Sequence, residues 1–232
     1  MIKRFTVLLL LAGIATIFAS LLLDYIPDSE LNLTGRYYAE HTAEDIGAAN
    51  IVTAIIVTYR GLDTLGEVTV LFLTAAIVGL VLARGRSVCM VRRELPPTGE
   101  LLSTGSRLLV PLILLLGAYV FVNGHLTPGG GFQGGAIIAS AILLLLLTNP
   151  LQRFSHRLIA IVESISGVLF VTIGVLGIFL AGGFLDNRIL PTGTFGELFS
   201  AGAIPLIYSL IGLKVGAEFS SMLVNLSETE ES

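Results

Sequence analysis

Cysteine and charge are scarce in this sequence. Its 232 residues include one cysteine, Cys89, which excludes an internal disulfide, a cysteine-ligated iron–sulfur cluster and a cysteine-based zinc site within the chain. Charged residues make up 13% of the chain, whereas soluble domains carry roughly a quarter. Apolar residues make up 54%, and the mean hydropathy is +0.89. This composition predicts an integral membrane protein.

The histidines give no sign of a metal centre. His41, His125 and His156 are far apart in the sequence and show no spacing typical of metal ligands. We therefore expect no metal or cofactor in this chain, and no catalytic site of its own.

Apolar runs predict an all-α membrane protein with about six transmembrane helices, each of about 20 residues. The runs cover residues 5–23, 68–83, 101–122, 132–148, 158–182 and 199–223. The first run follows Lys3 and Arg4, a pattern that also fits a signal peptide, but its length favours a membrane span. Residues 227–232 form an acidic tail, which we expect to be disordered.

Two segments between the first and second spans are predicted to lie outside the membrane. Residues 24–47 are polar and acidic, and we expect a loop whose charges are solvated, with a weak funnel for cations as the alternative. Residues 48–59 are apolar but too short to cross the bilayer. Their helical spacing predicts one short amphipathic or partly inserted helix on the outer side, with one face formed by Ile51, Ala54, Ile55 and Thr58.

Basic residues predict the orientation. They cluster at residues 3–4, 84–93 and 153–157, which all fall on one side of a six-span chain. Because positive residues favour the cytoplasmic side, both termini are predicted to be cytoplasmic. The strongest cluster, around Arg92 and Arg93, lies between two spans, so we interpret it as a lipid-headgroup anchor and linker rather than a nucleic-acid site.

A glycine-rich turn at residues 124–135 separates the third and fourth spans. Proline cannot continue a helix without losing a hydrogen bond, and glycines allow unusual backbone conformations, so one helix should end here and the next begin near Phe132. We expect a structural turn in which small residues let a neighbouring backbone pack closely. These residues are Pro128, Gly129, Gly130, Gly131, Gly134 and Gly135. Taken alone, the pattern also fits a simple helical hairpin.

The string LTPGGGFQGG at residues 126–135 resembles the signature of the B subunit of Mrp-type, multisubunit Na+/H+ antiporters. The resemblance extends over about residues 99–226 and includes IGLKVGAE at residues 211–218. A second resemblance covers about residues 10–82. There, residues 50–67 are similar to the C-terminal part of the Mrp A subunit, which in Mrp-linked membrane-bound hydrogenases is a separate small protein of the MbhE type. The chain therefore resembles two fused modules, residues 1–98 with two spans and 99–232 with four.

Three charged residues stand inside apolar runs. Glu163 lies about one and a half turns into the fifth span, and Lys214 and Glu218 lie one turn apart on one face of the sixth. Charges at that depth are costly and must be paired or face water. Two interpretations remain open: a Lys214–Glu218 pair that holds subunits together, or an ion path in which these groups carry protons or bind Na+.

A fourth candidate group begins the second span. Asp63 and Glu67 lie four residues apart on one helix face, and Arg60 can pair with Asp63. Two interpretations fit Asp63 and Arg60 equally well. The pair can cap the helix, or it can form an outer entrance for ions. Glu67 is followed directly by an apolar run, so we expect it inside the apolar zone and on the ion path.

The resemblance implies a non-redox accessory subunit that helps form the Na+ path of an antiporter module. The fusion of the two modules favours a larger respiratory complex, of the membrane-bound hydrogenase or sulfane sulfur reductase type, in the plasma membrane. The implied partners are other Mrp-type subunits, the lipid bilayer and a peripheral redox arm bound through other subunits, with Na+ and H+ as transported ions. A free-standing Mrp antiporter and a purely structural membrane scaffold are the alternatives.

Overall fold

The computed structural model describes residues 2–25, 30–85, 99–149 and 152–231, and every regular element among them is helical. The elements are α1 (Ile2–Leu23), α2 (Leu33–Asp45), α3 (Ile51–Ala54), the π-helix η1 (Ile55–Tyr59), α4 (Gly61–Gly85), α5 (Glu100–Val122), α6 (Gly131–Thr148), α7 (His156–Leu180), the 3-10 helix η2 (Asn187–Ile189) and α8 (Ile204–Glu231). Six of the described helices are long and apolar enough to cross a membrane, which confirms the predicted fold class.

The chain divides into two compact units, residues 1–37 and 38–232. The first unit contains α1 and the beginning of α2. The side chains of α1 are apolar on all sides of the helix and exposed, as expected of a helix that faces lipid or another protein. The second unit contains the other five long helices and all of the candidate site residues.

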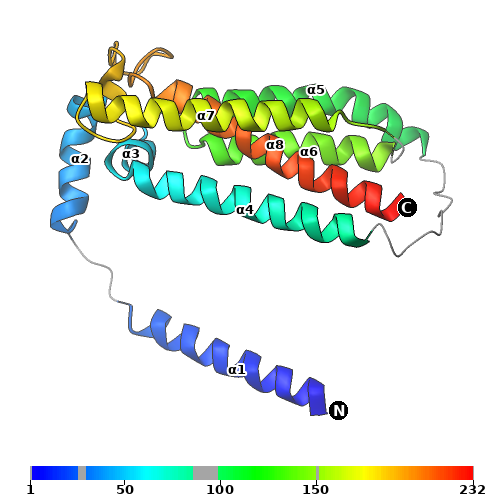
Figure 1. Cartoon of the computed structure of the whole chain (residues 1–232). Helices are drawn as coiled ribbons and strands as arrows, with labels where there is room; N and C mark the ends of the chain where they lie inside the picture. Colours follow the sequence, from blue (N-terminus) through cyan, green and yellow to red (C-terminus); the bar gives the residue numbers. More distant parts are fainter. Residues whose placement is uncertain (1, 26–29, 86–98, 150–151, 232) are drawn as a thin grey trace. The chain divides into compact units, whose positions relative to one another are not determined.

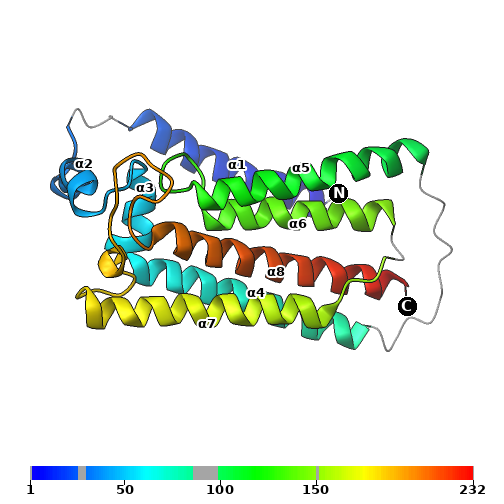
Figure 2. The same ribbon diagram turned by 90° about the horizontal axis from the view of Figure 1, so that it is seen from above.

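Helix α8 is the centre of the second unit. It packs against α4, α5, α6 and α7, and Figures 1 and 2 show it running through the middle of these four helices. Two thirds of its span, 67%, is buried, whereas no other span exceeds 33%. A membrane helix that is surrounded by protein can carry charged groups that a lipid-facing helix cannot, so α8 is the natural place for a buried site.

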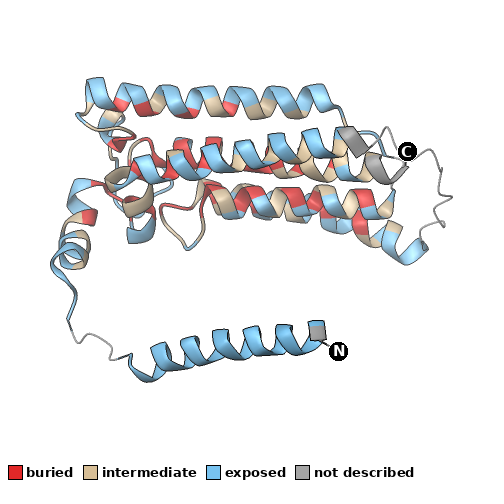
Figure 3. Ribbon diagram, turned by 60° about the horizontal axis from the view of Figure 1, so that its bottom comes forward, coloured by how far each residue is buried: buried red, intermediate tan, exposed pale blue. Residues whose placement is uncertain are grey.

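Buried residues gather on the inner faces of this bundle and where its connecting segments meet at one end (Figure 3). That end contains a core cluster that includes Ile46 before α3, Val57 of η1, Phe170 of α7, Leu185 of the α7–α8 connection and Ile204 of α8. Helix α3 begins there with Asn50, whose side chain accepts a hydrogen bond from the backbone N–H of Thr53 at 3.3 Å. The short segments at this end are therefore part of the fold, and not loose connections.

Several segments differ from the sequence-based expectation. Residues 33–45, predicted as a loop, form α2, and the tail predicted to be disordered is helical through Glu231. The short outer helix is α3 followed by η1, and it buries Thr53, Ala54 and Val57 while leaving Ile51 exposed. A π-helix has more residues per turn than an α-helix, so the regular spacing does not identify the buried face.

The cytoplasmic placement of the termini stays a prediction. The basic residues Arg86, Arg92 and Arg93 lie outside the described residues, as does the predicted junction of the two modules at residue 98. Within the second unit, the end of α4 and the beginning of α5 lie at the same end of the bundle as the beginning of α7 and the end of α8 (Figure 1). Consecutive membrane helices of this unit therefore run in opposite directions, as the six-span topology requires.

Candidate ion-path site

A buried ion pair lies in the middle of the central helix. The ammonium group of Lys214 is 2.7 Å from Oε1 of Glu218, one turn further along α8. The Glu218 side chain is 0% exposed and that of Lys214 is 9% exposed. The second carboxylate oxygen, Oε2, is buried and has no hydrogen-bond partner among the described residues. One strong acceptor in this site is thus left over after the pair has formed.

Lys214 also faces a cavity between α4, α7 and α8. The cavity has a volume of about 350 Å3 and is lined by Leu65, Val68, Thr69, Phe72, Glu163, Ser164, Gly167, Val168, Phe170, Val171 and Lys214. The ammonium nitrogen lies 5.0 Å from the centre of the Phe72 ring, at cation–π distance. Gly167 lies beside the lysine stem, since a Cβ at this position would be in ordinary contact with it, 3.5 Å from both Cδ and Nζ.

Glu163 brings a carboxyl group to the cavity that Lys214 faces, whereas Glu218 is not among the residues that line it. Glu163 lies on α7 and is half-buried. With both glutamates and the lysine ionised, the three groups carry a net charge of −1. The lining of the cavity is otherwise largely apolar, so Glu163 and Lys214 are its charged groups. A net negative charge at such a place suits a small cation or a transferable proton. The structure thus brings together Glu163, Lys214 and Glu218, which come from two helices.

The candidates at the beginning of α4 lie elsewhere. Glu67 is exposed and does not line the cavity, and its place on the ion path stays a prediction. The side chains of Arg60 and Asp63 form an ion pair at 2.5 Å and are 61% and 51% exposed. Helix geometry puts Asp63 roughly 13 Å along α4 from Phe72. These three residues lie at the beginning of α4, and they are separate from the buried pair.

The glycine-rich turn packs against α8. Helix α5 ends at Val122, six residues before Pro128, so the proline does not itself end that helix. Gly129 has a φ of +145°, which other residues rarely adopt. A Cβ at Gly135 would lie 2.7 Å from Cβ of Val215, one residue from Lys214. The turn therefore allows α6 to approach the part of α8 that carries the ion pair.

The other turn residues make similar close approaches. A Cβ would come within 3.0 Å of Tyr208 at Gly130, 2.6 Å of Ile211 at Gly131 and 2.7 Å of the Gly117 carbonyl oxygen at Gly134. Each distance is shorter than an ordinary carbon contact. A side chain at any of these positions would push α6 away from α8 or α5.

Sequence reasoning missed a network of hydrogen bonds at the beginning of α8, where the connecting segments meet. The hydroxyl group of Tyr208 donates to Oγ1 of Thr53 at 3.2 Å, and the Thr53 hydroxyl donates to the Gly124 carbonyl oxygen at 2.6 Å. His125 in the same turn is fully buried, with Nε2 at 3.3 Å from the Glu197 carbonyl oxygen. The network ties α3, the glycine-rich turn and α8 together, and no sequence pattern links these distant residues.

No group of three or more histidine, cysteine, aspartate or glutamate side chains is placed to hold a metal ion in the part of the chain that the structure describes. The buried pair and Glu163 together supply two carboxylates and one ammonium group.

Comparison with known proteins gives the family. Residues 101–221 match the family model described as a domain related to the MnhB subunit of Na+/H+ antiporters. The chain belongs to this MnhB-related family. Residues 3–92 match a second family model, MbhE, which describes the E subunit of MBH. All of the turn residues, and Glu163, Lys214 and Glu218, fall within the MnhB-related region.

Relatives of this MnhB-related chain include an uncharacterised protein of Methanocaldococcus jannaschii, 32% identical over 203 residues, which are 77% of each chain. The B subunit of the Na+/H+ antiporter of Bacillus subtilis is 38% identical over 101 residues, which are 41% of this chain and 65% of that protein. Multi-pass membrane insertion follows from the family and from the six apolar helices.

Two solved structures share the fold. A chain of the membrane-bound sulfane sulfur reductase, an archaeal respiratory membrane complex, superposes with a TM-score of 0.80 and 41% identity over 97% of this chain and 98% of that one. A chain of the Mrp complex from Dietzia sp. DQ12-45-1b gives 0.79 and 26% identity over 99% of this chain, but only 26% of that longer chain. Both are parts of multisubunit membrane complexes.

Proposed function

We propose that this MnhB-related chain is a non-redox subunit of an Mrp-type cation/proton antiporter module, built into a larger respiratory complex. Its partners are other antiporter subunits, and its place is the plasma membrane. The transported ions are Na+ and H+. The sulfane sulfur reductase type of complex is favoured over a free-standing antiporter because the similarity is higher, at 41% against 26% identity, and because the two chains have nearly the same extent. The match to the MbhE model supports the same setting.

Within that module, the cavity between α4, α7 and α8 contributes to the Na+ translocation path. The observation that carries this proposal is the Lys214–Glu218 pair, buried in the central helix and open through Lys214 to a cavity that also contains Glu163. A cation entering the cavity is attracted by the carboxylates. Movement of the Lys214 ammonium group toward or away from Glu218 changes how strongly they hold it.

The remaining candidates take peripheral places in this proposal. Glu67 is exposed on α4, so it contributes from the chain surface, toward a neighbouring protein of the complex. The Arg60–Asp63 pair shapes the outer entrance, and the glycine-rich turn is structural. The two modules, residues 1–98 and 99–232, remain our division of the chain.

A structural scaffold is the competing function. It is favoured by one observation, that Lys214 and Glu218 already satisfy one another within a single helix at 2.7 Å. In that case the pair only stabilises the packing of α8 against its neighbouring helices, and no ion passes through the cavity.

Transport in vesicles that contain the intact complex separates these two functions. The variants are Glu163→Gln, Lys214→Ala, Glu218→Gln and Glu67→Gln, each checked for assembly, with Glu100→Gln at the exposed beginning of α5 as control. We expect the Glu163, Lys214 and Glu218 variants to assemble and to lose most of the Na+ transport, while the control keeps it. Normal transport by every assembled variant would establish the scaffold instead.

A further inference from the structure

Polar side chains form a line along one face of α8, from the buried ion pair to the last turns of the helix. They recur every three or four residues, which is the spacing of neighbours on one helix face. With 3.6 residues per turn, the five positions fall within roughly 80° of one another around the helix axis. This line, which we call the polar seam, consists of Lys214, Glu218, Ser221, Asn225 and Glu228.

The polar seam lies where α8 meets α4 and α7. Lys214, at its inner end, contacts side chains or backbone of both helices, as described above. Further along, a Cβ at Gly79 of α4 would lie 3.9 Å from Nδ2 of Asn225. At the far end, Nε2 of His156, the first residue of α7, is 2.6 Å from Oε1 of Glu228. The polar groups are therefore placed between protein helices over a distance of roughly 21 Å along α8.

Exposure increases along the polar seam. The Glu218 side chain is fully buried, Ser221 and Asn225 are half-buried, and the Glu228 side chain is 34% exposed. The buried ion pair is thus connected, through a series of polar side chains, with the surface of the bundle.

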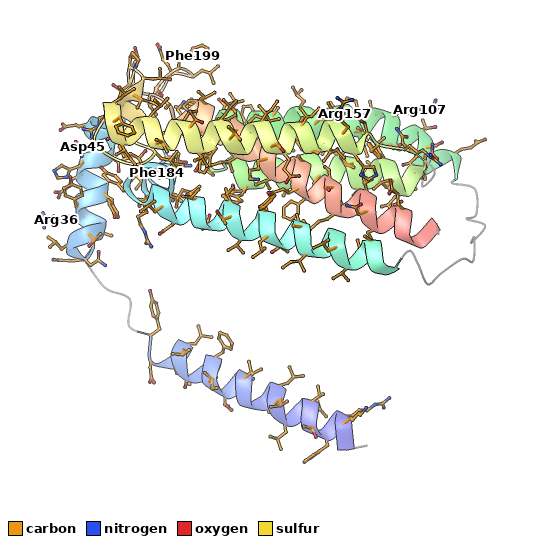
Figure 4. All side chains as sticks on the ribbon, viewed as in Figure 1. Arg36, Asp45, Arg107, Arg157, Phe184 and Phe199 are labelled. Atoms are coloured by element: carbon orange, nitrogen blue, oxygen red, sulfur yellow. The ribbon has the colours of Figure 1, made fainter. Side chains whose placement is uncertain are left out.

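A pair of titratable side chains stands where the polar seam reaches the surface. His156 and Glu228 form it, and histidine is the side chain that most readily gains and loses a proton near neutral pH. Arg157 follows His156 in the first turn of α7, and Arg107 of α5 lies toward the same end of the bundle (Figure 4). Because basic residues favour the cytoplasmic side, this is the end that we predict to face the cytoplasm.

Two adjacent serines show how the polar seam differs from the rest of α8. The Ser220 hydroxyl, off the seam, donates to the Gly216 carbonyl oxygen of its own helix at 2.6 Å. The Ser221 oxygen, on the seam, accepts from Nδ2 of Asn225 at 3.5 Å, which is longer than a typical hydrogen bond. Neighbouring seam positions are about 5–6 Å apart, a separation that one water molecule can bridge.

The inner end of the polar seam offers a place for a proton. Oε2 of Glu218 is buried and has no hydrogen-bond partner among the described residues, while Oε1 accepts from Lys214. A buried carboxylate oxygen of this kind is satisfied either by water or by a proton bound to it.

The polar seam suits a proton better than a metal cation. Hard cations take about six oxygen ligands wherever they rest, and each seam position offers a single side chain. A proton moves along hydrogen-bonding groups and waters, and it requires only a group at each end that can bind and release it. Glu218 at one end and the His156–Glu228 pair at the other are such groups.

We propose that the polar seam is a proton path between the His156–Glu228 pair and the buried carboxylate of Glu218. A proton leaves the pair, passes Asn225 and Ser221 by way of bridging waters, and forms an O–H bond at Oε2 of Glu218. The pair then takes up another proton from the aqueous side. The same steps in reverse release the proton.

This path deepens the proposed function and rests on it, because it supplies the H+ that the antiporter module exchanges for Na+. Protonation neutralises Glu218, so Lys214 loses the charge that it faces on its own helix. The ammonium group is then released toward Glu163, the other charged group of the cavity between α4, α7 and α8. Arrival of a proton thereby changes the charge that a cation meets in the cavity.

Access of water to the polar seam is measured first, in vesicles that contain the intact complex. Cys89, the one cysteine of the chain, is replaced by serine. A small cationic methanethiosulfonate, which reacts with thiols that water reaches, is then applied to Ser221→Cys and Ser220→Cys. Both changes are conservative and lie in the same turn. We expect the thiol at position 220 to react roughly ten-fold more slowly, because apolar surroundings exclude a charged reagent.

Proton delivery is measured next, as Na+/H+ exchange by the same vesicles. Asn225→Leu should lower the rate roughly ten-fold or more, because positioned proton-transfer groups contribute at least this much. The Na+ concentration for half-maximal exchange should stay unchanged. The solvent deuterium isotope effect should rise, since proton delivery becomes the slow step, and a loss of packing alone would not raise it.

Smaller substitutions keep this test valid if Asn225→Leu does not assemble. Ser221→Ala should show the same pattern more weakly, and Ser220→Ala, its matched control off the seam, should change neither the rate nor the isotope effect. Asn225→Ser keeps a hydrogen-bonding group in the seam and should retain most of the rate.

The proposal is overturned if the thiols at positions 220 and 221 react at the same rate. It is equally overturned if the assembled Asn225 and Ser221 variants exchange ions at the normal rate with an unchanged isotope effect. Failure of the proposed function looks different, because Glu163→Gln, Lys214→Ala and Glu218→Gln would then all transport Na+ normally.

Discussion

Nζ of Lys214 lies 2.7 Å from Oε1 of Glu218, and both charged groups are buried in the central helix of the bundle. A buried pair of this kind is stable only while both members are present, because each alone is a charge without compensation. This relationship gives a stability test that does not depend on transport.

Replacement of Lys214 by methionine should lower the free energy of unfolding by about 3–5 kcal/mol, because it leaves Glu218 buried and unpaired. The double variant Lys214→Met with Glu218→Met should recover most of that loss. Denaturant unfolding in detergent, analysed as a double-mutant cycle, measures the coupling. Glu163→Gln, at a half-buried position, is the control and should change little. Additive effects of the two single substitutions would show that the pair does not exist.

The contact between α6 and α8 should depend on Gly135. A methyl group there would lie 2.7 Å from Cβ of Val215 and 2.8 Å from the Gly212 carbonyl oxygen, so Gly135→Ala should destabilise the protein by about 1–3 kcal/mol. Gly105→Ala on α5 is a matched control, because nothing lies within 4 Å of the place that its new methyl group would take. It should be neutral or stabilising by about 0.5–1 kcal/mol, since alanine favours a helix. Equal effects of the two substitutions on the unfolding midpoint would contradict the close approach.

Acid should destabilise the fold through His125. Burial disfavours the charged imidazolium, and this outweighs the nearby backbone carbonyl oxygens of Glu197, Val122 and Leu198, so the pKa of His125 lies below its ordinary value of 6.5. The unfolded chain therefore binds more protons than the folded one as the pH falls below 6.5, and stability decreases until the folded-state pKa is passed. Melting curves across this range should show the decrease, and His125→Asn should flatten it. If the stability of the His125→Asn variant falls with pH as steeply as that of the unchanged protein, another group causes the loss.

A second acid-sensitive group should act at lower pH. Burial opposes ionisation of Asp186. The side chain and the backbone N–H of Arg188 donate hydrogen bonds to this carboxyl group, and the guanidinium charge attracts it. Together these effects outweigh burial and hold the pKa of Asp186 below its ordinary value of 3.8. The Nε group of Arg188 donates at 2.9 Å. The stabilisation is complete above pH 3.8 and is lost as the pH falls through the folded-state pKa. Asp186→Asn should lower stability at neutral pH and remove this acid-dependent component, which melting curves at low pH would reveal. An unchanged acid transition would contradict the prediction.

Apolar length and turn chemistry determined much of this protein from the sequence alone. The six spans end within a few residues of their predicted limits at most boundaries, because a run of about 20 apolar residues has few alternatives to a membrane helix. The turn at residues 124–135 was predicted for a similar reason, since glycine and proline restrict the backbone locally. The three charges within apolar runs could also be named in advance, because such residues are rare.

Tertiary structure alone decided which of these groups meet. Periodicity shows that Lys214 and Glu218 share a face of α8, but not that this face looks toward Phe72 of α4 and Gly167 of α7, which are distant in the sequence. Packing also decides that Glu67 is exposed on α4, apart from the Lys214–Glu218 pair. The buried side of residues 51–59 depends on a π-helix that propensity does not reveal. The local sequence determines where a helix begins and ends. Which other helices it packs against depends on contacts between segments that are distant in the sequence.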